Sequence, residues 1–215
     1  MKSAQREVDL ESDFALVESI LWEDCCGFWL LPEHLQRLRD SAAHFGFVWN
    51  EARILAQLDD VVKDLRCDSL VRVELRRDGT LNMRAKPASD DRRPVRAMPA
   101  TRPIDTDNAF LYHDTTRREQ DAGIYAAVTD GADETLLWNA RGEVTGSYTS
   151  NLVVEIDGEY YTPPLSSGVL PDAYRTSLMQ QGRLVERPIR LDELPACTKV
   201  YLINSSIGWR EVVLG

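Results

Sequence analysis

Lysine is scarce in this sequence, and basic residues are outnumbered by acidic ones. The 215 residues include four lysines, Lys2, Lys63, Lys86 and Lys199, and 25 basic against 35 acidic residues, for a net charge of −10. Nucleic acids and anionic membranes bind proteins through basic surfaces, so we predict neither as a partner. No apolar run approaches the roughly 20 residues that a membrane-spanning helix needs.

Cysteine is also rare. Cys25 and Cys26 are adjacent, whereas Cys67 and Cys197 stand alone, and this spacing suits neither a zinc site nor a disulfide framework. We therefore predict buried free thiols and no metal site. The first 13 residues are polar and lack the apolar core of a signal peptide. We expect a cytoplasmic protein with a flexible tail at residues 1–12.

The remaining composition is ordinary for a globular protein, with 43% hydrophobic and 28% charged residues. The first half predicts a β-β-α-α-β-β unit. Strands are expected at 14–22 and 28–31, and Pro32 and Gly46 suit the two ends of a helix. Asn50 suits the cap of a second helix. Alternating apolar residues around Asp78 and Gly79 predict a hairpin.

The second half predicts more strands than helices. We expect strands at 95–102, 134–138, 152–156, 159–162, 185–189 and 199–203. Helices are expected at 116–128, 171–182 and 191–196, the first through a capping box of Thr116 and Glu119. We place a small N-terminal α/β domain at 13–102, a linker at 103–109 and a larger α/β domain at 110–215. A cavity between them is expected near residues 103–110.

The central stretch Phe110-Leu-Tyr-His-Asp-Thr-Thr-Arg-Arg-Glu119 resembles the cofactor-anchoring segment of the class IV aminotransferases, which are fold-type IV pyridoxal-phosphate enzymes. It is most similar to aminodeoxychorismate lyase-like domains fused to aminodeoxychorismate synthase. Further motifs in the family's order lie at 14–22, 33–38, 138–145, 150–151, 162–171 and 204–209. The resemblance implies an α/β (α+β), two-domain scaffold like that of D-amino acid aminotransferase. It also implies a homodimer, and Trp22 and Trp29 beside an early hairpin suit an interface.

The sequence departs from the family pattern at cofactor contacts. Asp114 replaces the lysine that forms the Schiff base, and Gly146 replaces the acidic partner of the pyridine nitrogen. Asp172 replaces the glycine at the phosphate-binding helix, and Ile207 replaces the arginine of the last motif. Because the first two losses remove the imine and the electron sink, we predict that no cofactor is used. The triple variant Asp114→Lys, Gly146→Glu, Asp172→Gly is expected to regain cofactor binding better than any single change.

Asp114 is the candidate catalytic residue, as a general acid or base, although an acid before a helix also stabilises the helix dipole. The candidate ligand-binding residues are Arg37, Thr145, Ser150, Asn151, Tyr112 and Trp209. Arg37 equally suits a surface ion pair, and large aromatic residues such as Tyr112, Tyr148 and Trp209 more often belong to a core. We assign Arg117 and Arg118 to a solvated helix face. His113 and Asp114 are adjacent on an extended stretch and face opposite ways, so we predict no His-Asp dyad.

Three functions remain open from the sequence. The first is a cofactor-independent enzyme or ligand-binding protein for a small carboxylated, chorismate-like metabolite, lyase-like if it is an enzyme. The second is a pseudoenzyme that serves as an interaction subunit. The third is an active pyridoxal-phosphate enzyme in which Lys86 or Lys199 replaces the missing lysine. An open polar cavity favours the first over the second, because a ligand needs room and polar partners.

Overall fold

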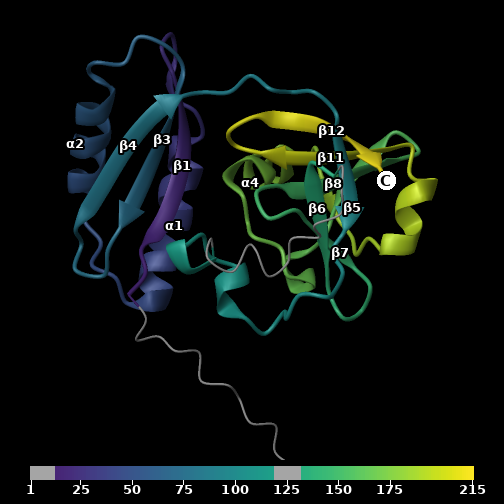
Figure 1. Ribbon diagram of the computed structural model, residues 1–215. Coiled ribbons are helices and arrows are strands. Elements are labelled where there is room, and N and C mark those ends of the chain that lie inside the picture. Colours follow the sequence, from purple (N-terminus) through teal and green to yellow (C-terminus); the bar gives the residue numbers. More distant parts are fainter. Residues whose placement is uncertain (1–12, 119–131) are drawn as a thin grey trace, which may run out of the picture.

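The computed structural model describes residues 13–118 and 132–215, which form two sheets with separate cores (Figure 1). The first sheet is antiparallel and has the order β2-β1-β3-β4. In chain order its elements are β1 (Leu16–Glu23), β2 (Gly27–Phe28), α1 (Leu31–Phe45), α2 (Glu51–Val62), β3 (Ser69–Leu75) and β4 (Leu81–Pro87). The predicted β-β-α-α-β-β order is confirmed.

Both helices cover one face of the first sheet because each presents a single apolar stripe. The buried side chains that meet there are Leu16, Ile20, Leu38, Ala42, Phe45, Ile54, Leu58, Val71, Val73 and Leu75. Helix α1 ends at Gly46, which has a φ of 70° and donates its N–H to the carbonyl oxygen of Ala42. The Asn50 side chain accepts from the N–H of Arg53 at 3.0 Å and caps α2. Both predicted helix boundaries are thus confirmed.

The second sheet has the order β10-β9-β8-β11-β12-β5-β6-β7. Its elements are β5 (Val95–Pro99), β6 (Glu134–Trp138), β7 (Val144–Gly146), β8 (Asn151–Ile156), β9 (Glu159–Thr162), β10 (Val185–Glu186), β11 (Lys199–Asn204) and β12 (Gly208–Leu214). Helix α4 (Ala173–Gln180) and the short 3-10 helices η1 (Ala109–Leu111), η2 (Leu165–Ser167) and η3 (Leu191–Ala196) connect the strands. Since β7 also pairs with β8, the strands from β8 round to β7 close into a ring.

The sequence misplaced strand β5 of this sheet and did not predict strands β7 and β12. Strand β5 was predicted inside the N-terminal domain, but it pairs in parallel with β12 and β6 in the second sheet. The division between the sheets therefore falls between β4 and β5 rather than after residue 102. Strand β12 itself was not predicted, because its polar and apolar residues follow no regular alternation.

The central segment joins the two cores. Phe110 packs edge-on against Phe14 of the first core, with ring centroids 5.2 Å apart, while Leu111 belongs to a cluster on the second sheet. A helix begins at Thr116, but its cap is Thr115, whose Oγ1 accepts from the N–H of Arg118 at 3.0 Å. The predicted cap at Thr116 is therefore one residue too late. The predicted partner Glu119 and the helix to residue 128 reach beyond the described residues.

The expected burial of the cysteines is wrong. Cys25, Cys26 and Cys67 are exposed, and Cys197 is half-buried. Cys25 and Cys26 occupy the turn between β1 and β2, where the chain reverses at the surface and offers no core to enter. None of the helices described is long and apolar enough to cross a membrane.

Candidate functional site

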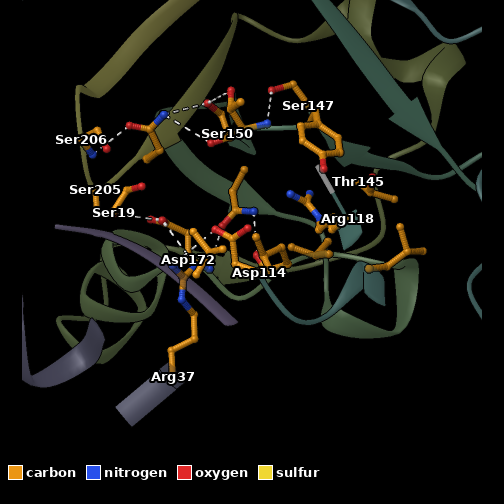
Figure 2. A pocket seen from close by; sticks show the side chains of 18 of the residues that line it. Ser19, Arg37, Asp114, Arg118, Thr145, Ser147, Ser150, Asp172, Ser205 and Ser206 are labelled. Atoms are coloured by element: carbon orange, nitrogen blue, oxygen red, sulfur yellow. Dashed lines mark hydrogen bonds and ion pairs between the residues drawn. The ribbon is translucent and has the colours of Figure 1, made fainter. Parts of the chain in front are cut away.

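A cavity of about 240 Å³ lies between the two sheets (Figure 2). Side chains alternate along a strand, so the residues of β1 and β3 that point away from the helices reach this cavity. They are Val17, Ser19, Leu70 and Arg72. The second sheet contributes the turn from β7 into β8 and the loop that leads into α4. Residues 103–109 contribute nothing to the lining, so the cavity does not lie at the predicted linker.

The structure brings five of the seven predicted site residues to this cavity. They are Arg37, Asp114, Thr145, Ser150 and Asn151. Tyr112 lines a neighbouring hollow of about 430 Å³, and its hydroxyl donates to the carbonyl oxygen of Thr106 at 2.9 Å. Trp209 is not part of the lining: its ring packs on Tyr201, and its Nε1 donates to the hydroxyl of Tyr174. Of the two roles considered for Trp209, packing within the protein core describes its position.

Backbone hydrogen bonds hold Asp114 at the cavity. The Val17 N–H donates to the Asp114 carbonyl oxygen at 2.9 Å, and the Thr116 N–H donates to the Ala15 carbonyl oxygen at 3.0 Å. The Thr116 hydroxyl accepts from the Ala15 N–H in turn. Residues 114–116 thus run beside the start of β1, and the Asp114 carboxylate lies 4.0 Å from an Arg37 nitrogen.

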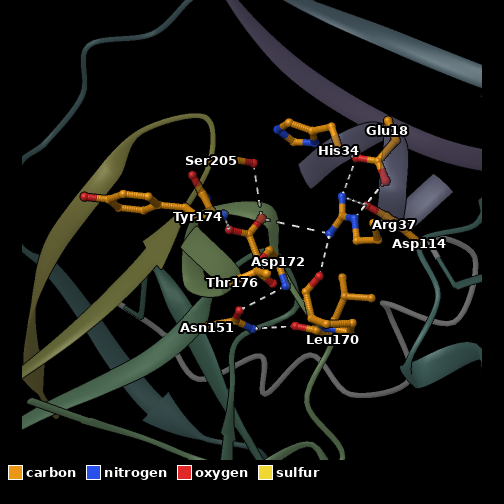
Figure 3. Close-up of polar contacts among 12 residues, drawn as sticks. Glu18, His34, Arg37, Asp114, Asn151, Leu170, Asp172, Tyr174, Thr176 and Ser205 are labelled. Carbon is orange, nitrogen blue, oxygen red and sulfur yellow. Dashed lines mark hydrogen bonds and ion pairs between the residues drawn. The ribbon is translucent and has the colours of Figure 1, made fainter. Parts of the chain in front are cut away.

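Arg37 is enclosed by carboxylates (Figure 3). Its Nε and Nη2 donate to the two oxygens of Glu18 at 2.7 and 2.6 Å, and Asp172 lies 3.9 Å from its Nη1. Burial alone would lower the pKa of Arg37, but Glu18 first, and then Asp114 and Asp172, raise it. A fully charged Arg37 therefore already has its counter-ions within the protein. It is neither the surface ion pair nor the open ligand contact that the sequence suggested.

Glu18 is the centre of this network. It accepts from Arg37 and also contacts Nδ1 of the buried His34 at 2.7 Å. Burial would raise the pKa of Glu18, yet the Arg37 charge and the His34 hydrogen bond hold it below its usual value. Glu18 lies on β1 with its side chain toward α1. Its ionised carboxylate therefore holds the Arg37 guanidinium in place from the β1 side.

Asp172 occupies the N-terminus of α4. Its carboxylate accepts from the Tyr174 N–H at 2.8 Å and from the Ser205 hydroxyl at 3.2 Å. The Asp172 N–H donates to Asn151 Oδ1 at 3.3 Å, and Asn151 Nδ2 donates to the Leu170 carbonyl oxygen (Figure 3). The helix end that would attract an external anion therefore carries a carboxylate of the chain itself.

Arg118 is the cavity residue that the sequence assigned wrongly. It is 7% exposed and lines the cavity, with its guanidinium carbon 4.3 Å from the centre of the Tyr148 ring (Figure 2). Successive residues of a helix point about 100° apart, so adjacent arginines can differ in burial, and the direction in which the helix faces decides which of them turns inward.

His113 and Asp114 separate as predicted. His113 lines the neighbouring hollow, where its Nδ1 lies 2.9 Å from Ser41 Oγ and its ring stacks on His44. Burial, together with the nearby His44, lowers the pKa of His113 to about 4. His113 is thus neutral at pH 7 and faces a different hollow from the carboxylate. Within 13–118 and 132–215, no cluster of His, Cys, Asp and Glu is suited to a metal ion.

Comparison with known proteins agrees with this architecture. Residues 15–214 match the family described as amino-transferase class IV. The chain belongs to the class IV aminotransferase family. It is 28% identical over 191 residues to a Schizosaccharomyces pombe protein named "Putative aminodeoxychorismate lyase", covering 82% of this chain and 80% of that protein.

Solved class IV structures share the fold. A crystal structure titled "Putative amino-acid aminotransferase" from Mesorhizobium loti has a TM-score of 0.86 and 32% identity, over 94% of this chain and all of the other. A structure titled "Putative 4-amino-4-deoxychorismate lyase" from Legionella pneumophila has a TM-score of 0.82 and 20% identity, over 100% and 87% of the two chains. The predicted family and the fold-type IV scaffold are thereby confirmed.

The described lysines lie away from the class IV cavity. Lys63 pairs with Asp60 at 2.6 Å, and Lys199 pairs with Glu211 at 3.1 Å. Lys86 is exposed on the edge strand β4. None of these three lines the cavity, so neither Lys86 nor Lys199 is positioned to replace the missing lysine.

Gly146 is required by the backbone of this class IV chain. Its φ is 144°, and a Cβ added there would collide with the Ser150 carbonyl oxygen and lie 3.3 Å from Asn151 Cα. No side chain fits without moving the turn between β7 and β8. The expectation that Gly146→Glu would help to restore cofactor binding is therefore wrong.

Proposed function

We propose that this class IV homologue does not use pyridoxal phosphate, and that its cavity binds a small carboxylated molecule. The cofactor needs an amine for the imine, an acidic partner for its ring nitrogen and an anchor for its phosphate. By the resemblance of the sequence motifs, Asp114 and Gly146 stand where the first two groups are expected, and neither residue supplies them. The residues present do not fit the cofactor.

The enclosure of Arg37 carries this proposal. Asp172 occupies the helix end that suits a phosphate, and its carboxylate lies on the side of Arg37 opposite to Glu18 (Figure 3). Two unit charges about 4 Å apart repel by about 4 kcal/mol at an effective dielectric of 20. This weakens phosphate binding by about three orders of magnitude.

The cavity favours a ligand over a filled, purely structural site. It is open, it is lined by hydroxyl and amide groups beside the charged residues, and its roughly 240 Å³ suit a small metabolite. This observation supports a binding protein or enzyme over a pseudoenzyme whose cavity has collapsed. The names of the relatives suggest chorismate-like carboxylates as ligands to test first.

Asp114 is the group that we propose for chemistry, if the bound ligand reacts. A carboxylate in a cavity moves a proton to or from a ligand atom within hydrogen-bond reach. We propose that Asp114 acts as a base in the first step, with Arg37 4.0 Å from its carboxylate. A lyase that removes a proton next to a carboxylate is consistent with such a base.

We also propose that the protein is a cytoplasmic homodimer, by analogy with the family. The structural hint from the early tryptophans is weaker than expected. Trp29 packs on Tyr174 of the same chain, with ring centroids 4.8 Å apart. Sedimentation at micromolar concentration measures the oligomeric state directly, and a monomer there contradicts this part of the proposal.

Titration with pyridoxal phosphate tests the central claim. The wild-type protein should develop no aldimine absorbance and should carry no cofactor adduct after borohydride reduction. Asp114→Lys supplies an amine but keeps Asp172, so we expect weak labelling. The double variant Asp114→Lys, Asp172→Gly should label more strongly, because it also frees the helix end. A cofactor adduct on any lysine of the wild-type protein would refute the proposal.

A further inference from the structure

The cavity contains a buried positive charge that has no counter-ion among the residues that the structure describes. Arg118 is 93% buried, and neither an ion pair nor a side-chain hydrogen bond joins its guanidinium to another described residue. In the described part of the chain its buried Nε–H has no acceptor. Its guanidinium lies over the face of the Tyr148 ring. Buried arginines are normally paired, so this guanidinium is suited to an anion that enters the cavity.

Charged groups of both signs line the cavity, the cations Arg37, Arg72 and Arg118 and the anions Asp114 and Asp172. At one end, the single cation Arg37 meets Glu18, Asp114 and Asp172. Arg118 lines the same cavity as Asp114, and no ion pair joins it to a carboxylate among the described residues (Figure 2). A ligand that carries one negative charge is thus attracted to the positive charge of Arg118. A second negative charge would face the carboxylates around Arg37.

The remaining polar lining consists largely of hydroxyl groups. They belong to Thr145, Ser147, Thr149, Ser150, Ser205 and Ser206. A hydroxyl both donates and accepts, so it matches hydroxyl groups of a ligand in either sense. The carboxylates of Asp114 and Asp172 accept hydrogen bonds and cannot donate when ionised. They suit ligand hydroxyls beside Arg37.

We propose that Arg118 is the carboxylate anchor of the cavity, and that the preferred ligand is a hydroxylated monocarboxylic acid. Phosphate and dicarboxylates bind more weakly. This rests on the proposed function, because it assumes that the cavity holds a ligand instead of the cofactor. It narrows that function, since chorismate has two carboxylates and a second one would lie near Asp114 and Asp172.

Calorimetric titration with four probes tests this assignment. Shikimate carries one carboxylate and three hydroxyls, benzoate lacks the hydroxyls, chorismate adds a carboxylate, and inorganic phosphate lacks carbon. The wild-type protein should bind shikimate saturably and at least tenfold more tightly than the other three. Arg118→Gln should weaken shikimate binding by about 10–100-fold, as expected for the loss of charged hydrogen bonds.

The adjacent Arg117 provides the matched control. Arg117 lies over the Phe110 ring and does not line the cavity, so Arg117→Gln should leave shikimate affinity unchanged. Arg118→Lys keeps the charge but loses the forked geometry, and about tenfold weaker binding is expected. If Arg118→Gln does not fold, the Arg118→Lys result decides: weakened binding supports the assignment and unchanged binding refutes it.

Three results would overturn the proposal. They are unchanged shikimate binding in Arg118→Gln, absence of saturable shikimate binding to the wild type, and tighter binding of chorismate or phosphate than of shikimate. None of them depends on the borohydride experiment. A cofactor adduct on the wild-type protein refutes the proposed function, whereas these titrations refute the role of Arg118.

Discussion

Replacing Asp172 separates its two roles, as a helix cap and as an internal anion. Asp172→Asn keeps an oxygen for the Tyr174 N–H but removes the charge that faces Arg37. Asp172→Ala removes both. We expect the two variants to differ in stability by the cap alone, and to share the effect on anion binding.

The distances set the magnitudes. At 3.9 Å and an effective dielectric of 20, the attraction between Asp172 and Arg37 is about 4 kcal/mol before desolvation is subtracted. Desolvation of both groups offsets much of this, so Asp172→Asn should lower the free energy of unfolding by about 1–2 kcal/mol. Asp172→Ala should lose about 1 kcal/mol more through the missing cap. Affinity for inorganic phosphate should rise by about 1,000-fold in both, since about 4 kcal/mol of repulsion is removed.

Urea unfolding and phosphate titration measure these two effects independently. Asn50→Ala is the control, because it removes an uncharged cap from α2 in the other lobe. It should cost about 1 kcal/mol and leave phosphate binding unchanged. If phosphate affinity does not rise in Asp172→Asn, the carboxylate does not exclude anions, and the argument from the enclosure of Arg37 is wrong.

Three further predictions concern stability. Glu18→Gln should lower the free energy of unfolding by about 3–5 kcal/mol in urea, because a buried pair loses one partner. A His113 pKa of about 4, below its unfolded value of 6.5, means that stability is complete above pH 6.5 and falls as pH drops toward 4. Discounted for partial exposure, the loss in the free energy of unfolding between pH 6.5 and pH 4 is about 1–2 kcal/mol, which unfolding curves at several pH values measure. His113→Gln should remove this dependence on pH. Gly146→Ala should cost about 3–5 kcal/mol, whereas Gly158→Ala, with φ of 83° but open space, should cost about 1 kcal/mol; equal losses would contradict the backbone collision.

Local signals in the sequence predicted local structure well. Gly46, Asn50 and the Asp78-Gly79 turn lie where their backbone preferences placed them. The position of β5 could not be predicted in this way, since its partners β12 and β6 are far away in the chain. The residues of one strand do not show which other strand it pairs with. Burial of the cysteines failed for a similar reason: it depends on where a turn lies in the fold.

Site residues could be predicted where they interrupt a family motif. They could not be predicted where no motif marks their position. Asp114 and Asp172 stood out because they interrupt motifs that the rest of the chain retains. Glu18 did not stand out, although it holds Arg37 more closely than either. The burial of Arg118 could not be predicted from the Arg117-Arg118 pair, because it depends on the direction in which the first helical turn faces.

The two acidic replacements have a joint consequence for the charge of the cavity. Arg37 and Glu18 neutralise each other, so Asp114 and Asp172 add two negative charges at that end. A cavity built to hold a phosphate would require the opposite sign there. Arg118 lines the same cavity and forms no ion pair with another described residue. Burial of a guanidinium destabilises the fold unless an anion compensates its charge, and a ligand in the cavity would supply that anion. The reversal of charge beside Arg37 is therefore what we expect from a change of ligand, from a phosphate at α4 to a carboxylate at Arg118.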